Sequence, residues 1–410
     1  PAARKQRRGT LQSTCRCGLW LLRKQRALWT RLSSGVKPMQ GRGLTVVGAS
    51  AGSGKTHRLT TEIERAVSAE GERAVRPEGL VAVTYTKRAQ VELESRIRQA
   101  LLKSKTPERA ASLPLAYVGT VHAVCFRWLK DHALDVGLSP DLAVLDDDGL
   151  LLAQVLEQTV PAEDREQLDE LADRLEMHID HRESMVHWDQ PVEDIITLAR
   201  HGRIAASALE SMAERSWRGL LDLLPQPLVS GPALDEALDR AVKHALEFVD
   251  LTLDATKVTK DAVEKLRAFE RSLRFGRPSW GAWAALAGLH AGKKSDALFA
   301  PVRQNAAAYE QHPQFHADLR QFTELVYRAA ALTLDRYARR KAERGLVDYV
   351  DMIDHALSLL SDESVVEDLR QRLQLVVVDE LQDSSPIQLA LFLRLNEIAG
   401  RSAWVGDPKQ

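Results

Sequence analysis

Cysteine is scarce in this chain: it occurs three times in 410 residues, at positions 15, 17 and 125. Three cysteines cannot build a disulfide framework, and so few thiols are typical of a reducing cytosol. The Cys15-Arg-Cys17 pair has no second pair with which to complete a zinc site. No apolar run approaches the length of about 18 residues that a membrane-spanning helix needs. We therefore expect a cytoplasmic protein that does not enter a membrane.

Acidic residues are absent from the first 38 positions, which carry 10 lysines and arginines. Residues 39–410 hold 46 basic and 57 acidic side chains, so the net charge of −1 hides a basic leader and an acidic body. Three interpretations of the leader remain open: a nucleic-acid-binding arm, a transit-like segment, or sequence translated from upstream of the true start. We favour the third, because Met39 stands just before the first predicted strand. On this hypothesis residues 1–38 are disordered or form an isolated helix outside any site.

Short apolar segments rich in β-branched residues alternate with polar helical segments in two parts of the chain. Strands are predicted at 44–48, 80–85, 116–120, 375–378 and 403–405, and helices from Thr56, from Lys87 and over 333–343. This alternation is typical of a parallel α/β sheet. Between residues 141 and 330 the apolar positions recur at helical spacing, and no segment predicts a strand. We therefore predict one α/β domain, made of residues 39–140 and 331–410, with a large helical insertion at 141–330.

A turn of small residues follows the first predicted strand and ends in Lys55-Thr56. Without large side chains, its backbone N–H groups can close around a phosphate. Lys55 would bring a positive charge to the β- and γ-phosphates, and the Thr56 hydroxyl would bind Mg²⁺. The turn consists of Ala49, Ser50, Ala51, Gly52, Ser53 and Gly54, with alanine where the strict pattern has glycine. An accidental glycine-rich turn is the alternative, but strand, turn and Lys-Thr together predict a nucleoside triphosphate site.

Two carboxylates follow the apolar run at 375–378. Because an α/β sheet binds its ligands at the carboxyl ends of its strands, Asp379 would hold Mg²⁺ through the ion's water shell. Glu380 would orient or deprotonate the attacking water. A pair of solvated acids at a strand end is the alternative, but the phosphate-binding turn upstream favours the catalytic interpretation. The helical insertion accounts for the long separation between the two motifs.

The Asp-Glu-Leu-Gln-Asp sequence at 379–383 resembles motif II of superfamily 1 helicases of the UvrD/RecB/AddA type. Residues 49–56 resemble motif I of that family, including its alanine. Further matches follow in order: 84–97 resembles motif Ia, 119–125 motif Ib, 347–353 the segment before motif II, and 404–410 motif III. The resemblance implies a RecA-like P-loop fold that includes domain 1A. Its helical subdomain 1B would correspond to residues 141–330.

The resemblance assigns a DNA-binding track to the residues that end two further strands. Tyr85 would stack on an unpaired base, a contact of about 1–3 kcal/mol that reads no sequence. Phosphate contacts would come from Thr84, Thr86, Lys87, Thr120 and His122. Lys87 stands where the family usually has asparagine. A core tyrosine is the alternative for Tyr85, and a packed histidine at the start of a helix is the alternative for His122.

The remaining predicted roles come from the resemblance alone. Gln382 and Gln410 would contact or sense the γ-phosphate. Asp383 would link the nucleotide site to motif III, and Asp407 would couple that site to the DNA track. Gln40 would read adenine, with an ordinary surface glutamine as the alternative.

The activity that the resemblance implies is that of an ATP-dependent 3′–5′ DNA helicase or translocase in repair or recombination. The sequences around Gln40 and motif III favour the RecB/AddA type. ATP and Mg²⁺ would be the cofactors, and single-stranded or tailed duplex DNA would be the substrate. A partner from a helicase–nuclease complex is also expected. The acidic body does not argue against DNA, because a local groove rather than the total charge holds the strand.

Motifs IV to VI, with the arginines that stabilise the transferred phosphoryl group, do not occur in the sequence. We therefore expect this chain alone to bind Mg·ATP weakly, to hydrolyse it poorly and not to translocate. The alternative is a truncated non-motor subunit or regulator that binds nucleotide or single-stranded DNA. The intact Lys55, Asp379 and Glu380 favour the motor. A third interpretation, a P-loop kinase or transporter-type ATPase, would not explain the presence of Gln382.

Overall fold

The computed structural model describes residues 43–48, 55–69, 74–103, 107–134, 137–139, 141–180, 185–186 and 188–407. These residues fall into two compact units. The first unit contains the described residues up to Val124, together with Leu360–Asp383 and the described residues from Phe392 onward; the second contains Cys125–Leu359 and Ser384–Leu391. No helix within the described ranges is long and apolar enough to cross a membrane. The basic leader, residues 1–38, lies outside the described residues. The domain boundaries predicted from the sequence stay predictions.

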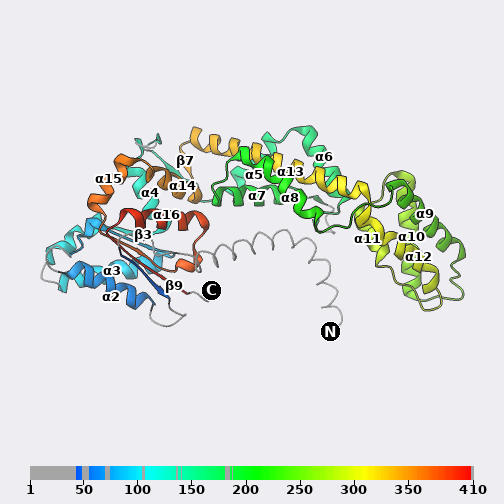
Figure 1. Ribbon diagram of the computed structural model, residues 1–410, viewed down its shortest axis with the longest axis horizontal. Coiled ribbons are helices and arrows are strands. Elements are labelled where there is room, and N and C mark those ends of the chain that lie inside the picture. The colour runs from blue at the N-terminus through cyan, green and yellow to red at the C-terminus, as the bar shows by residue number, and fades with distance from the viewer. Residues whose placement is uncertain are drawn as a thin grey trace. The chain divides into compact units, whose positions relative to one another are not determined.

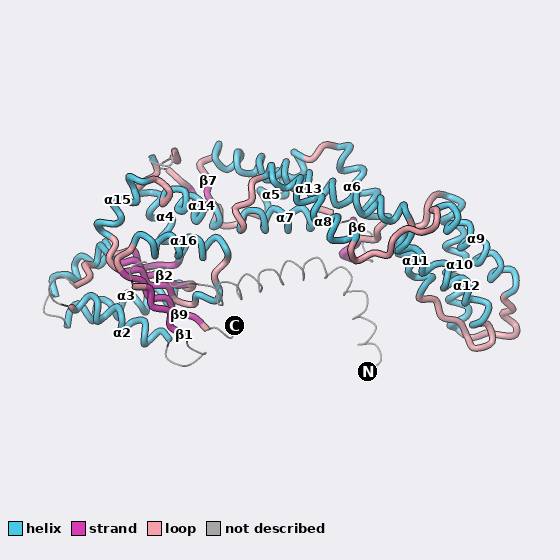
Figure 2. Tube along the Cα trace, in the orientation of Figure 1, coloured by secondary structure: helices cyan, strands magenta, loops and turns pink. Residues whose placement is uncertain are grey.

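A five-stranded sheet forms the centre of the first unit (Figures 1 and 2). Its strands are β1 (Leu44–Gly48), β2 (Leu80–Thr84), β3 (Tyr117–Thr120), β8 (Leu375–Val378) and β9 (Arg401–Gly406). They lie in the order β1-β9-β8-β2-β3, and every neighbouring pair is parallel. All residues of β2 and β8 are buried, as expected for central strands covered on both faces. The predicted parallel α/β sheet is confirmed.

Helices surround this sheet in the order that the alternation predicts. Their bounds are α2 (Lys55–Ser68), η2 (Pro77–Gly79), α3 (Lys87–Lys103), η3 (Pro107–Leu115), α15 (Glu363–Arg372) and η6 (Leu381–Asp383). α4 (Val121–Asp131) and α16 (Pro386–Ile398) have residues in both units. Leu93, Ile97 and Leu101 recur every fourth residue on α3 and pack with Leu59 and Ile63 of α2 in one buried cluster against the sheet.

The second unit is almost entirely helical. Its helices are α5 (Gly149–Thr159), α6 (Ala162–Arg174), α7 (Asp189–His201), α8 (Ala206–Leu221), α9 (Gly231–Phe248), α10 (Lys257–Phe275), α11 (Trp280–Ala287), α12 (Asp296–Ala306), η5 (Ala307–Gln311), α13 (Pro313–Glu343) and α14 (Tyr349–Leu359). The long helix α13 packs with α5, α6, α7 and α8 around one apolar core, and α9 to α12 enclose another. The predicted presence of a helical insertion is confirmed.

The expectation that no strand lies between 141 and 330 is wrong. The structure contains β4 (Ala143–Val144), β5 (His178–Asp180) and β6 (Met185–Val186) in this range. β5 and β6 form an antiparallel pair, and β4 pairs in parallel with β7 (Leu346–Val347). Strands of two or three residues are too short to show a period-two pattern, which is why the sequence does not reveal them.

The pairing of β4 with β7 joins the segment that enters the helical part of the second unit to the segment that leaves it. Ala143 N donates to Gly345 O over 3.0 Å, and Leu145 N donates to Val347 O over 2.9 Å. Gly345 has φ +62°, in the left-handed region that glycine adopts without strain. This turn ends α13 and directs the chain into β7.

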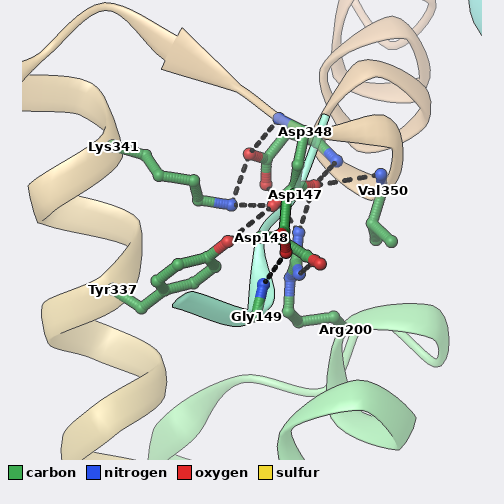
Figure 3. Close-up of polar contacts among 9 residues, drawn as sticks. Asp147, Asp148, Gly149, Arg200, Tyr337, Lys341, Asp348 and Val350 are labelled. Carbon is green, nitrogen blue, oxygen red and sulfur yellow. Dashed lines mark hydrogen bonds and ion pairs between the residues drawn. The ribbon is translucent and has the colours of Figure 1, made fainter. Parts of the chain in front are cut away.

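A buried ion network surrounds Asp348, directly after β7 (Figure 3). Lys341 Nζ lies 2.6 Å from Asp348 Oδ2, and the Tyr337 hydroxyl donates to the same oxygen over 3.1 Å. Arg200 of α7 contacts both Asp348 and Asp351, and Lys341 also contacts Asp351. Two cations therefore face two carboxylates, and helices α7, α13 and α14 are joined at one point.

Asp348 is also the N-cap of α14. Its Oδ1 accepts hydrogen bonds from Val350 N and Asp351 N, each over 3.0 Å, and Asp351 Oδ2 accepts from Asp348 N over 3.2 Å. This reciprocal arrangement is a capping box, with aspartate in place of the usual glutamate at its third position. Burial alone would raise the pKa of Asp348, but Lys341 and Arg200 outweigh it and lower the pKa to about 2.

Candidate nucleotide and nucleic-acid site

The carboxyl ends of all five parallel strands meet at one edge of the sheet in the first unit. The register there pairs Gly48 with Gly406, Val378 with Trp404, and Thr84 with Thr120. Because ligands of open α/β sheets bind at this edge, it is the candidate site. The structure brings together the predicted residues that end β2, β3, β8 and β9.

Asp379 continues the central strand by one residue. Its N–H donates to Val83 O over 3.1 Å, and its side chain is buried. Asp379 Oδ1 accepts a hydrogen bond from Glu380 N over 3.0 Å. A buried carboxylate at this position offers the hard oxygen ligand that Mg²⁺ prefers. The described residues contain no group of three or more His, Cys, Asp or Glu side chains that could hold a metal, but Mg²⁺ in nucleotide sites is held mainly by one or two side chains and the phosphates.

Glu380 turns the chain away from the strand. Its φ of +48° lies in the left-handed region, which is uncommon for a residue with a side chain. Its carbonyl accepts from Asp383 N over 3.0 Å, which closes the short 3₁₀ helix η6. The strand therefore ends abruptly, and the carboxylate of Glu380 follows directly on that of Asp379.

The Gln382 side chain connects Glu380 to the end of β9. Its Nε2 donates to Glu380 Oε2 over 2.7 Å and to Asp383 Oδ2 over 3.2 Å. Its Oε1 accepts from the backbone N–H of Asp407 over 2.8 Å. Asp407 is buried, whereas Asp383 is exposed. Gln382, Asp383 and Asp407, which the sequence places in two separate motifs, thus belong to one hydrogen-bonded group.

Gly406 is a member of this group that the sequence prediction does not name. A Cβ atom at this position would lie 3.1 Å from Gln382 Oε1 and 3.2 Å from the Cβ of Leu381. Both distances are tighter than ordinary van der Waals contact, so the absence of a side chain lets η6 approach β9. The only signal in the sequence is a glycine immediately before Asp407, which does not reveal the neighbour.

The predicted DNA-contacting residues lie where β2 and β3 run into helices. Thr86 Oγ1 accepts from Ala89 N over 3.1 Å, and Thr120 Oγ1 accepts from Ala123 N over 3.3 Å. Each threonine is therefore an N-cap, of α3 and α4 respectively, and its hydroxyl proton remains available to another acceptor. The N-termini of α3 and α4 therefore lie beside the predicted phosphate contacts. Helix N-termini favour anions, which suits this prediction.

The other residues of this predicted track differ in accessibility. Thr84 is buried, and its hydroxyl donates to Thr86 O over 3.3 Å. Lys87 is exposed, whereas Tyr85 and His122 are half-buried. Burial lowers the pKa of His122, which favours its neutral form at pH 7. It would then meet a phosphate as a hydrogen-bonding group and not as a cation.

Several predicted site residues lie outside the described residues or have side chains that do. Gln40, residues 49–54 and Gln410 are not described, and the side chains of Lys55 and Thr56 are not described either. β1 ends at Gly48 and α2 begins at Lys55, so the strand and the helix on either side of the predicted phosphate turn are both present. The roles of these residues stay predictions.

A parallel sheet of this order, with an acid pair at the end of its central strand and a helical insertion, defines a RecA-like α/β fold. The chain belongs to the UvrD/REP helicase family: residues 33–410 match the UvrD/REP helicase N-terminal domain. Membership in a UvrD/RecB/AddA-like family, predicted from the motifs, is confirmed.

Several bacterial proteins that bear the name of the A subunit of an ATP-dependent helicase/nuclease are similar to this chain. That of Pelotomaculum thermopropionicum is 26% identical, over 90% of this chain and 33% of its own length. Those of Alkaliphilus metalliredigens and Clostridium novyi are 23% and 24% identical, each over 93% of this chain and over 35% and 34% of their own lengths. The chain spans about a third of the length of these relatives.

Proposed function

We propose that this chain is the ATP-binding part of an ATP-dependent DNA helicase or translocase of the UvrD/RecB type, with 3′–5′ polarity, that acts in DNA repair or recombination. The observation that carries the proposal is the acid pair Asp379-Glu380, which follows the buried central strand and whose second member is hydrogen-bonded through Gln382 to the end of β9. Family membership and the names of the similar proteins support the helicase assignment. A helicase–nuclease complex with a partner subunit is the corresponding proposal for its assembly.

The proposed mechanism uses the residues at the carboxyl edge of the sheet. The turn at 49–54 and Lys55 would bind the phosphates of ATP, while Thr56 and Asp379 would hold Mg²⁺. The ion, when bound, neutralises charge on the phosphates during transfer. Glu380 accepts the proton of the attacking water, and Gln410 contacts the γ-phosphate. Gln40 reads the adenine base.

The DNA strand would run past the ends of β2 and β3. Tyr85 stacks on an unpaired base, and Thr86, Lys87, Thr120 and His122 contact phosphates. Thr84 is buried and already donates its hydroxyl proton within the loop, so its proposed contribution is to hold the shape of that loop. Asp383 and Asp407 would couple the nucleotide site to this track.

ATP hydrolysis with and without single-stranded DNA tests the proposal. It should be measured in single turnover on residues 39–410 and on the full natural reading frame, with Lys55→Ala as the inactive control. We expect DNA to stimulate hydrolysis by the full protein, and Lys55→Ala to abolish it. If nucleotide and DNA bind but DNA never stimulates hydrolysis in either protein, a non-motor binding subunit replaces the motor.

A further inference from the structure

The hydrogen bonds of Gln382 join Glu380, the candidate base, to the end of β9. Gln382 Nε2 donates to Glu380 Oε2 over 2.7 Å, while its Oε1 accepts from Asp407 N over 2.8 Å. A backbone N–H can only donate, so the amide oxygen must face Asp407 and the NH₂ group must face the carboxylates. The orientation of the amide is thereby fixed at both ends.

The backbone of Glu380 is held in an uncommon conformation. Its φ of +48° is an uncommon conformation for a residue with a Cβ atom, and such conformations persist where the surroundings over-determine them. Hydrogen bonds from Glu380 N to Asp379 Oδ1 and from Asp383 N to Glu380 O fix its peptide groups. The contact from Gln382 fixes the carboxylate itself, and so it limits where this side chain can place its oxygen atoms.

The other end of Gln382 lies against β9. Gly406, the last residue of β9, leaves room for the close approach, since a Cβ there would lie 3.1 Å from Gln382 Oε1. A displacement of the backbone at Asp407 would therefore move the amide, and the amide would move the Glu380 carboxylate. If Oε1 accepted a hydrogen bond from a group outside β9, movement of β9 would not reach Glu380 through Gln382.

We infer that Gln382 is a positioning residue: it holds the carboxylate of Glu380 in place and ties that place to the end of β9. This inference rests on the proposed function, in which Glu380 is the base for ATP hydrolysis. It differs from the expectation drawn from the sequence, in which Gln382 senses the γ-phosphate directly. The two roles predict different effects on binding and on turnover.

Gln382→Glu separates these roles, because glutamate has the same shape and can still accept from Asp407 N but cannot donate to Glu380. The variant is measured in the full-length protein, with Gln371→Glu on the exposed face of α15 as the matched control. We expect the rate of single-turnover ATP hydrolysis to fall about 100-fold, as for a misplaced catalytic group. The ratio of ATP to ADP affinity should change less than about twofold, because binding is not the function of the contact.

A double-mutant cycle with Glu380→Gln shows whether Gln382 acts through Glu380. Once Glu380→Gln has removed the base, Gln382→Glu should reduce hydrolysis little further. Gln382→Met, which is neutral and of similar length, should reproduce the loss of rate. It also keeps the test valid if the added charge of Gln382→Glu disturbs folding.

Three results would overturn the inference: a full additional loss in the Glu380→Gln background, a selective loss of ATP over ADP affinity, or unchanged rates in both Gln382 variants. A failure of the proposed function is distinct from all three. In that case the unsubstituted full-length protein would itself show no DNA-stimulated hydrolysis.

Discussion

Replacing Lys341 by methionine removes one of the two cations from the buried network around Asp348. The side chains of Lys341 and Asp348 are 4% and 2% exposed, and Nζ lies 2.6 Å from Oδ2. Breaking a buried ion pair by removing one partner costs about 3–5 kcal/mol, because the remaining charge stays buried without full compensation. Methionine has a similar length, so the change leaves little cavity.

The expected loss lies at the lower end of that range, near 3 kcal/mol. Asp348 keeps the contact with Arg200, the hydroxyl of Tyr337 and two backbone N–H groups. Urea unfolding followed by circular dichroism measures the change, and an unaltered m-value indicates that the unfolding reaction is the same. Lys265→Met on the exposed face of α10 is the control, with an expected effect within about 0.5 kcal/mol.

The reasoning would be refuted if Lys341→Met cost no more than Lys265→Met. The network would then contribute nothing that the remaining contacts do not already supply. A double variant with Asp348→Asn provides a second check. The double variant should lose less stability than the sum of the losses in the two single variants. Each single variant leaves one charge of the Lys341–Asp348 pair without its partner, whereas the double variant removes both charges.

The pKa of Asp348 is lowered to about 2, so its carboxylate stabilises the fold above pH 4 and loses this effect as the pH falls from about 4 to 2. In Asp348→Asn, the free energy of unfolding should therefore fall by about 2 kcal/mol less over this pH range than in the unsubstituted protein, as measured by unfolding at several pH values. Gly406→Ala should push Gln382 from its place and slow ATP hydrolysis about tenfold; an unchanged rate would contradict this contact. Lys87→Ala should lower the slope of log affinity for single-stranded DNA against log salt by about 0.7, whereas His122→Gln, which replaces a residue whose pKa burial lowers, should leave the slope unchanged. Equal slopes for both variants would exclude a phosphate contact by Lys87.

The sheet could be predicted from the sequence because each strand is a short run of apolar, β-branched residues with polar segments on both sides. β8 is Leu-Val-Val-Val, and the structure buries all four residues. Parallel order and the shared carboxyl edge then follow from the alternation with helices. This edge brings Asp379, Thr84 and Thr120 together, although they come from distant parts of the chain.

The helical unit was harder to predict in detail. The sequence predicts a helix over 333–343, whereas α13 begins at Pro313 and has 31 residues. Helical spacing recurs throughout 141–330, but it does not show where one helix ends and the next begins, as at the break between α7 and α8 near Gly202. Tertiary packing of the apolar faces decides these boundaries, and local periodicity does not contain that information.

The partners of buried polar groups could not be predicted either. Asp348 lies in a segment that the motifs identify, but its partner Arg200 is separated from it by 148 residues. The contact between Gln382 and Asp407 likewise depends on the sheet order, which places β9 beside β8. Spacing along a sequence identifies residues that carry chemistry, and only the fold identifies what holds them.

Strand separation by the full natural protein tests the central claim most directly. Duplex DNA with a 3′ single-stranded tail, and matched DNA with a 5′ tail, should be incubated with ATP and Mg²⁺. We predict ATP-dependent separation from the 3′ tail, and none by Glu380→Gln, which should still bind ATP and DNA. Binding of both ligands without hydrolysis or strand separation by the unsubstituted protein would contradict the claim that this chain belongs to a DNA motor.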